Sequence, residues 1–353
     1  MKKEESVKNV EWLLCKDIEQ KYGMKIKKLE KMKLGTAQCY KIQAERNLYF
    51  AKIYQKKHKF EQITREIQIC QYLNDNNMNI SVYVKNLQGE FINIQEYGIF
   101  TIQKYINGIT YEKYAVPENV LYQSAEILAN IHKLLGHFSG FNIDFSPKWI
   151  REMADSSENA KKIEKIIKKA ENMPDHLLKD MIIEDCKWKI KMLPSLSRLQ
   201  NEFNSLTRKN SHGDYNTYQW ICEKGKIKAI IDFGSCSNLP IIWEMIRSYT
   251  YAAQECSKII EMNMECYCRY LSHYLKNNTL SCNDLQRGFA FYYYTLMPST
   301  FGYKQYIDDY MKGKYNNLIE FAFWRTRMCQ YLAQNADFLD NYVCEKIGVV
   351  TFK

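Results

Sequence analysis

Hydrophobic and polar positions divide the chain into a strand-rich first part and a helix-rich remainder. Residues 7–22 carry apolar side chains at helical spacing and end at Gly23, which predicts an amphipathic helix. The period of the pattern then shortens. Apolar runs bounded by polar residues predict strands at 25–29, 39–42 and 48–54, a helix at 60–73, and further strands at 80–84, 90–94 and 100–105.

From Pro117 onward the pattern is helical almost throughout. Long amphipathic stretches occupy residues 156–206, 241–275 and 284–339. The exception is a short hairpin with strands at 220–222 and 227–233. This order predicts an α+β protein of two lobes.

The two lobes are expected to differ in size and content. The N-terminal lobe, residues 1–105, would contain a leading helix and a small antiparallel sheet. The C-terminal lobe, residues 106–353, would be larger and helical, with the hairpin as its only strands. The 353 residues are 46% hydrophobic, which is enough apolar material for two packed lobes.

Composition narrows the classes of protein. The net charge of +10 is the excess of 50 Lys and Arg over 40 Asp and Glu, and the lysines are spread along the chain, so we expect no nucleic-acid partner. Twelve cysteines occur without a CxxC pair, which favours reduced, buried thiols over a zinc site or disulfides. No apolar run approaches the roughly 18–20 residues that cross a bilayer, so we expect a cytoplasmic protein without a membrane partner.

The candidate chemistry lies around the hairpin. Asp214 follows a glycine in a polar loop, which predicts a carboxylate at a surface. Asp232 ends an apolar strand, where a charge is costly to bury without a partner or a metal ion. The hairpin would bring Gln219 and Asp232 onto neighbouring strands, so that they share one cation. We interpret Asn216 as part of the turn, and His132 as a core histidine on a helix.

The segment His212-Gly213-Asp214, with Asp232 eighteen residues later, resembles the aminoglycoside phosphotransferase and choline kinase-like superfamily, whose members are related to the protein kinases. The helix-rich C-terminal part is also similar to the bacterial spore-coat kinase-like branch. The resemblance implies a two-lobed, protein-kinase-like fold. It also implies that Asp214 is the catalytic base and that Asp232 is the principal magnesium ligand.

The first lobe contains further parts of the resemblance. Lys52 lies in an apolar strand pattern, and Glu66 follows fourteen residues later on the next helix. The resemblance implies that this pair holds the nucleotide phosphates. Gln103 and Tyr105 lie in the segment 98–106, which resembles the strand and hinge that bind adenine.

Two positions depart from the family pattern. Gln219 stands where an asparagine usually ligates magnesium, and its longer side chain needs an adjusted backbone to do so. The segment 31–37, at the place of the phosphate loop, has a single glycine instead of a GxGxxG motif. The second departure favours a small-molecule kinase over a protein kinase.

The sequence therefore predicts a phosphotransferase that uses ATP and Mg²⁺ to phosphorylate a hydroxyl group of a small molecule, such as an amino alcohol, a sugar or an aminoglycoside-like compound. The alternative is a catalytically impaired binding or assembly protein of the same fold, such as a spore-coat component. The acceptor site is expected within residues 140–206 and 250–340, with the tyrosines at 292–294 as candidates for its lining. The pattern predicts neither the acceptor, the choice between ATP and GTP, nor the oligomeric state.

Overall fold

The computed structural model describes residues 2–32, 37–45, 47–55, 58–138, 153, 155–174, 177–198, 200–257, 260–314 and 316–351. The chain forms two compact units. The first unit contains residues 1–110, 138–140 and 218–236, and the second contains 111–137, 141–217 and 237–353. The predicted α+β architecture, with a small antiparallel sheet and a larger helical part, is confirmed.

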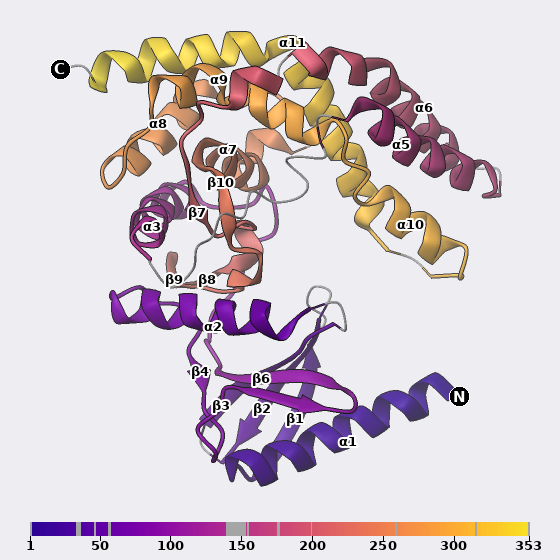
Figure 1. Ribbon diagram of the computed structural model, residues 1–353, viewed down its shortest axis with the longest axis vertical. Coiled ribbons are helices and arrows are strands. Elements are labelled where there is room, and N and C mark those ends of the chain that lie inside the picture. Colours follow the sequence, from indigo (N-terminus) through magenta and orange to yellow (C-terminus); the bar gives the residue numbers. More distant parts are fainter. Residues whose placement is uncertain are drawn as a thin grey trace. The chain divides into compact units, whose positions relative to one another are not determined.

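The first unit is built around one antiparallel sheet (Figure 1). Its strands follow the order β1-β2-β3-β6-β4, and β5 pairs with β6. Lys52 on β3 lies opposite Thr101 on β6. The strands are β1 (Ile26–Met32), β2 (Gln38–Ala44), β3 (Asn47–Ile53), β4 (Tyr83–Val84), β5 (Ile92–Gln95) and β6 (Gly98–Lys104).

The leading helix α1 (Lys2–Tyr22) covers one face of this sheet (Figure 1). Its apolar stripe, Leu14 and Ile18, is fully buried against Tyr40 and Ile42 of β2. Burying side chains of this size contributes roughly 1.5–3 kcal/mol each. The predicted amphipathic helix is therefore part of the core of the first unit.

The hairpin belongs to the first unit, whereas the sequence placed it in the C-terminal lobe. Its strands are β8 (Trp220–Glu223) and β9 (Lys226–Ile230). Cys222 and Ile109 exchange two backbone hydrogen bonds, and Ile230 bridges to Ile80. These pairings attach the hairpin to chain segments that precede the second unit, so the division of the chain does not follow a single cut after residue 105.

The second unit consists mainly of helices. Two short strands, β7 (Arg208–Ser211) and β10 (Ser237–Pro240), pair antiparallel within it. Figure 1 shows α5 and α6 side by side and the long α11 packed along α9. The helices are α3 (Glu118–Gly136), α5 (Ser156–Glu171), α6 (Leu177–Met192), α7 (Ile241–Ala252), α8 (Met264–Leu275), α9 (Cys282–Leu296), α10 (Tyr303–Tyr310) and α11 (Leu318–Thr351).

Local sequence signals explain where two of these helices begin. Asp155 caps α5 by accepting a hydrogen bond from Glu158 N. Ser281 and Asp284 form a reciprocal capping box at the start of α9. The second carboxylate oxygen of Asp284 accepts from Thr207 N, so the same residue also fixes the chain before β7.

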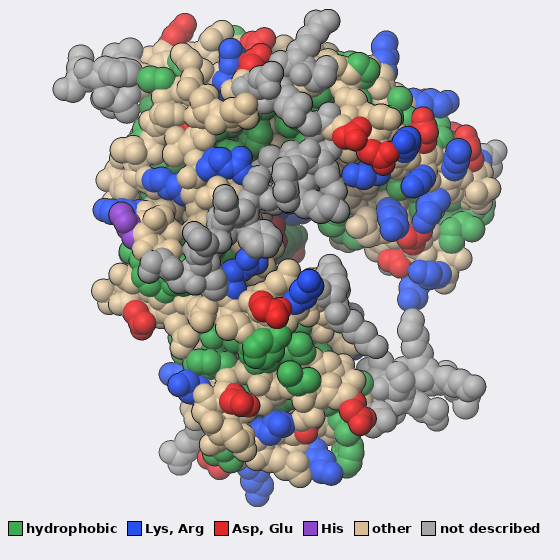
Figure 2. Space-filling model, viewed as in Figure 1, with side chains coloured by type: hydrophobic (Ala, Val, Ile, Leu, Met, Phe, Trp, Pro, Cys, Tyr) green, Lys and Arg blue, Asp and Glu red, His purple; other side chains and the backbone are tan. Residues whose placement is uncertain are grey.

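The charged side chains on the surface over α5 and α6 are of both signs. In Figure 2 the lysines and arginines over α5 and α6 are interspersed with acidic residues, as in the ion pair between Lys161 and Glu158 at 2.7 Å. Among the described residues, none of the helices combines the length and the apolar content that a membrane span requires.

Candidate active site

Lys52 is held between two carboxylates in the first unit. Its Nζ donates to Glu66 Oε1 at 3.1 Å and to Asp232 Oδ1 at 2.8 Å. Burial lowers the pKa of Lys52, but the negative charges of Glu66 and Asp232 more than reverse this effect and raise the pKa well above its ordinary value. Lys52 is therefore a fixed cation on β3, as the sequence placed it.

Glu66 is positioned from α2 (Phe60–Asp75) on the helix face that is buried. Its side chain is 4% exposed, and Oε2 accepts a hydrogen bond from Tyr54 OH at 3.2 Å. The predicted pairing of Lys52 with Glu66 is thus present as an ion pair. Its role in holding phosphates stays a prediction.

Asp232 has an unusual backbone conformation, with φ 64° and ψ 64°. Non-glycine residues rarely adopt this left-handed region, and they are found there preferentially at functional sites. The side chain is 47% exposed, so one oxygen pairs with Lys52 while the carboxylate remains accessible. A Cβ atom at Gly234 would lie 3.2 Å from Glu66 Oε2, which explains why a glycine follows so closely.

The backbone of Gln219 lies close to Asp232, because the two strands of the hairpin pair with each other. Ile231 N donates to Gln219 O at 3.0 Å, so the backbone of Gln219 is next to the residue that precedes Asp232. A carboxylate and an amide oxygen are hard oxygen donors, and Mg²⁺ commonly uses one or two carboxylates and completes its shell with phosphates and water. The residues present therefore fit a magnesium ion that a nucleotide helps to hold.

Gln103 and Tyr105 lie at the end of β6. Gln103 is buried and lies between Phe50 of β3 and Tyr83 of β4 in the sheet. Tyr105 N donates to Leu48 O at 3.1 Å, so this amide is already used within the first unit. Their role in adenine binding stays a prediction. The single-glycine segment, 31–37, lies largely outside the described residues, which omit 33–36.

Asp214 lies on the loop after β7 in the second unit. The backbone of this loop is hydrogen-bonded to the carboxylate of Glu244 on α7. Glu244 is fully buried and accepts hydrogen bonds from His212 N at 3.1 Å and Gly213 N at 2.6 Å. Asn216 Nδ2 donates to the carbonyl of Asp214 at 2.7 Å, which confirms that Asn216 belongs to the turn. The loop is thus a fixed platform, and the side chain of Asp214 is 38% exposed on it.

His132 supports Glu244 from α3 and is a satisfied core histidine, as predicted. Its Nδ1 lies 2.9 Å from Tyr274 OH, and its Nε2 lies 3.1 Å from Glu244 Oε2. Burial lowers the pKa of His132, which favours the neutral ring, and the carboxylate of Glu244 is an acceptor, so Nε2 is the nitrogen that donates to it. Burial raises the pKa of Glu244, but the hydrogen bond from His132 and nearby positive charge outweigh it and lower that pKa.

Replacing Glu244 with alanine is expected to destabilise the second unit by about 3–5 kcal/mol, because buried N–H groups lose their shared acceptor. The change is measured as the shift in the urea midpoint of unfolding. Glu265→Ala is the control, since Glu265 is 69% exposed and its contacts with Lys346 and Tyr342 OH lie at the surface. Equal midpoints for the two variants would contradict the role assigned to Glu244.

Arg247 of α7 pairs with Asp214 and was not foreseen. Its Nη2 donates to Asp214 Oδ1 at 2.5 Å. The guanidinium lies 4.6 Å from the ring centroid of Tyr251 and 5.5 Å from that of Trp243. Arg247 comes one helical turn after Glu244, but nothing in the sequence marks it as more than a surface arginine of a helix.

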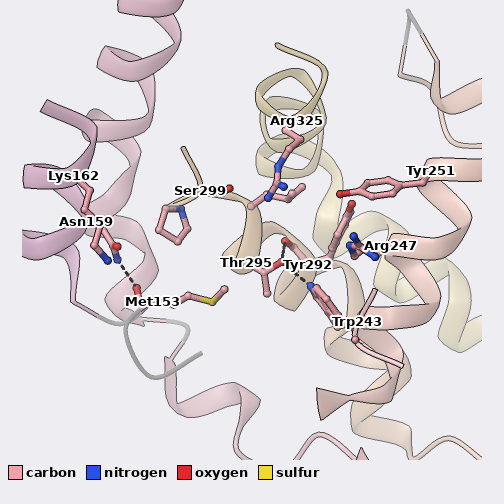
Figure 3. Close-up of a pocket in the computed structure, with 13 residues that line it drawn as sticks. Met153, Asn159, Lys162, Trp243, Arg247, Tyr251, Tyr292, Thr295, Ser299 and Arg325 are labelled. Carbon is pink, nitrogen blue, oxygen red and sulfur yellow. Dashed lines mark hydrogen bonds between the residues drawn. The ribbon is translucent and has the colours of Figure 1, made fainter. Parts of the chain in front are cut away.

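Next to this pair the second unit contains a cavity of about 320 Å³. Figure 3 shows Arg247, Tyr251 and Tyr292 on one side, Asn159 and Lys162 on the other, and Arg325 reaching between them. Of the three tyrosines named from the sequence, Tyr292 lines the cavity, whereas Tyr293 and Tyr294 are buried and do not line it.

Comparisons with known proteins support the same fold. A microcompartment-associated aminopropanol kinase is similar with a TM-score of 0.66 at 12% identity, covering 93% of this chain and 98% of that one. An amicoumacin kinase has a TM-score of 0.63 at 13% identity, with 94% and 96% covered. A choline kinase from Streptococcus pneumoniae has a TM-score of 0.58 at 15% identity, with 92% and 99% covered. A comparison with curated proteins finds no match.

The family assignment rests on the sequence itself. The model of one family, described as the phosphotransferase enzyme family, matches residues 35–271, which is more than half of the chain. The match includes Lys52, Glu66, Asp214 and Asp232. The chain belongs to the phosphotransferase enzyme family.

Proposed function

We propose that this small-molecule kinase transfers the γ-phosphoryl group of ATP to a hydroxyl group of its acceptor in a magnesium-dependent reaction. The observation that carries the proposal is the position of Lys52 between Glu66 and Asp232. Phosphoryl transfer depends mainly on positioning and on charge stabilisation, and this arrangement supplies a fixed cation and an accessible carboxylate.

The first unit would bind the nucleotide. Lys52, oriented by Glu66, would hold the phosphates, and the segment of Gln103 and Tyr105 would bind the base. Asp232 and Gln219 would hold Mg²⁺. When bound, the metal ion supplies positive charge against the phosphate oxygens. To bind Mg²⁺, Asp232 would give up its contact with Lys52 and ligate the metal ion instead.

The second unit would activate the acceptor. Asp214 would accept the proton of the acceptor hydroxyl while the hydroxyl oxygen forms a bond to the γ-phosphorus. The bond between that phosphorus and the bridging oxygen breaks, and ADP leaves with the electron pair. The rigid support of the loop by Glu244 fits this role, since a base acts efficiently only when its position is fixed.

The names of the similar structures support a hydroxyl acceptor of low molecular weight. They describe kinases of aminopropanol, amicoumacin and choline. Aminopropanol and choline are both amino alcohols, and phosphorylation of such compounds takes place on a hydroxyl oxygen. At 12–15% identity these names do not define the acceptor of this chain.

A screen for ATP consumption tests the proposal. The purified protein is incubated with ATP, Mg²⁺ and a panel of hydroxylated metabolites, and ADP is measured for each compound. We expect ADP formation that requires one compound or a chemically related group of compounds and that stops when Mg²⁺ is chelated. Binding of ATP without consumption across a broad panel would instead support a catalytically impaired binding or assembly protein. The glutamine at position 219 would then be one cause of the missing turnover.

A further inference from the structure

Within the part of the chain that the structure describes, the charged side chains that line the cavity of the second unit are all basic. Three cations line it: Lys162 from α5, Arg247 from α7 and Arg325 from α11 (Figure 3). Among the described residues that line the cavity, none is an aspartate or a glutamate. The rest of the lining is aromatic, apolar or neutral and polar, and the carboxylate paired with Arg247, that of Asp214, lies outside the lining.

Two of these cations have hydrogen-bond donors without an acceptor. Nη1 of Arg247 and Nε of Arg325 are buried and make no hydrogen bond. Only Nη2 of Arg247 is engaged, with Asp214. A buried donor without a partner costs about 1–3 kcal/mol, and charged donors cost more. Guanidinium groups satisfy such donors best with the oxygens of a carboxylate or a phosphate.

A further basic residue, Lys113, lies close to the aromatic residues at the cavity. Lys113 Nζ is 3.2 Å from the ring centroid of Phe321 and 5.1 Å from that of Tyr251. Burial and the charges of Arg247 and Arg325 lower the pKa of Lys113 to about 7, although Asp214 and Glu112 act in the opposite direction. At the position of Lys113 the charges of the two guanidinium groups therefore outweigh those of the two carboxylates.

The aromatic rings at the cavity offer an alternative that the geometry disfavours. Aromatic rings bind amine ligands through their faces. Here Arg247 lies over the rings of Trp243 and Tyr251, and Lys113 lies over Phe321. At Trp243 and Tyr251, two of the three described aromatic rings that line the cavity, a ligand cation would therefore be repelled by positive charges of the protein.

We propose that the acceptor carries an anionic oxygen group, a carboxylate or a phosphate, which binds in this cavity to Arg325 and Arg247. The inference rests on the proposed function, because it makes this cavity the acceptor subsite beside Asp214. It departs from choline and aminopropanol, which carry a cationic nitrogen. The volume of about 320 Å³ is at the lower end of the range for ligand sites, which favours a short-chain or single-ring acceptor.

Direct binding of probe compounds to the purified protein tests this inference without requiring turnover. Matched four-carbon probes differ only at one end: hydroxybutyrate carries a carboxylate, butanediol a hydroxyl and aminobutanol an amine. Glycerol phosphate and inorganic phosphate form the second arm, which distinguishes a phosphate site from a carboxylate site. Calorimetry or a fluorescence titration gives the Kd of each probe.

We expect at least one anionic probe to bind, and to bind roughly tenfold or more tightly than its neutral and amine counterparts. Arg325→Gln should weaken this binding by about tenfold or more, because it removes the guanidinium with the unpaired donor. Arg327→Gln is the matched control, since it removes the same charge from an exposed position on the same helix. The control should leave the affinity unchanged.

A second readout follows from Lys113. An anion in the cavity raises its pKa, so binding at about pH 7.5 should take up protons, measured by calorimetry in buffers of different ionisation enthalpy. The affinity for the anion should decrease as the pH rises above about 7, and this dependence should be reduced in Lys113→Met. The charged groups that act on Lys113 are Arg247, Arg325, Asp214 and Glu112.

Three results would overturn the inference: tighter binding of the amine probe, no binding of any anionic probe at millimolar concentration, or an anion affinity that Arg325→Gln leaves unchanged. Failure of the proposed function looks different. Phosphorylation of amine-bearing compounds alone would support the kinase reaction and refute the anionic acceptor. Binding of anions together with an inability to consume ATP would support the anion site and refute the phosphotransfer.

Discussion

Asp214→Asn is expected to lower the turnover number by on the order of 10²–10⁴-fold or more, while the affinity for ATP changes little. The amide keeps an oxygen that accepts the hydrogen bond of Arg247 but no longer accepts the proton of the acceptor hydroxyl. The residues proposed to bind the nucleotide lie in the first unit and Asp214 lies in the second, so we expect the affinity for ATP to be largely independent of this carboxylate. Steady-state kinetics and a nucleotide titration separate the two effects.

A matched control separates the loss of the base from the loss of an ion-paired carboxylate. Asp308→Asn removes a carboxylate of similar exposure, 36% against 38%, which pairs with Lys169 at 2.5 Å. Its kinetics should equal those of the wild type. If Asp214→Asn retained turnover within about twofold of this control, Asp214 would not be the base.

Asp232→Asn is expected to cause the second large loss, of at least about 10²-fold in turnover, together with loss of the magnesium dependence of ATP binding. The substitution removes a negative charge that pairs with Lys52 and that would hold the metal ion. Asparagine tolerates the left-handed backbone of this position, so the fold should persist. ATP affinity is measured with Mg²⁺ and with a chelator, and turnover is measured at saturating Mg²⁺.

Glu45→Gln provides the control for this variant. Glu45 also has a positive φ, 49°, and lies in the first unit at the turn between β2 and β3. The control should retain the magnesium dependence of ATP binding in full. Magnesium-stimulated turnover at the wild-type rate in Asp232→Asn would contradict the assignment of the metal ligand.

Much of the fold follows from hydrophobic periodicity. The strands of the first unit and α2 agree with their predicted ranges to within a few residues, because alternating and helical patterns differ clearly there. The pairing of β7 with β10 was not predicted. The sequence of β7, Arg208–Ser211, has no apolar residue, so no pattern marks it as a strand.

The parts of the site were predictable to different degrees. Lys52 and Glu66 lie at positions that local patterns and the family resemblance select, and the ion pair between them is present. The cations at and near the cavity of the second unit were not predictable. Lys113, Arg247 and Arg325 are distant in the sequence, and each resembles an ordinary surface residue until the helices of the second unit bring them together.

Phosphorus-31 NMR of the reaction mixture tests the central claim most directly, once the screen has identified an acceptor that consumes ATP. The account predicts a new phosphate-ester signal on the acceptor that grows as the γ-phosphate signal of ATP disappears and that is absent with Asp214→Asn. Release of inorganic phosphate without an ester signal would contradict phosphotransfer to a hydroxyl group.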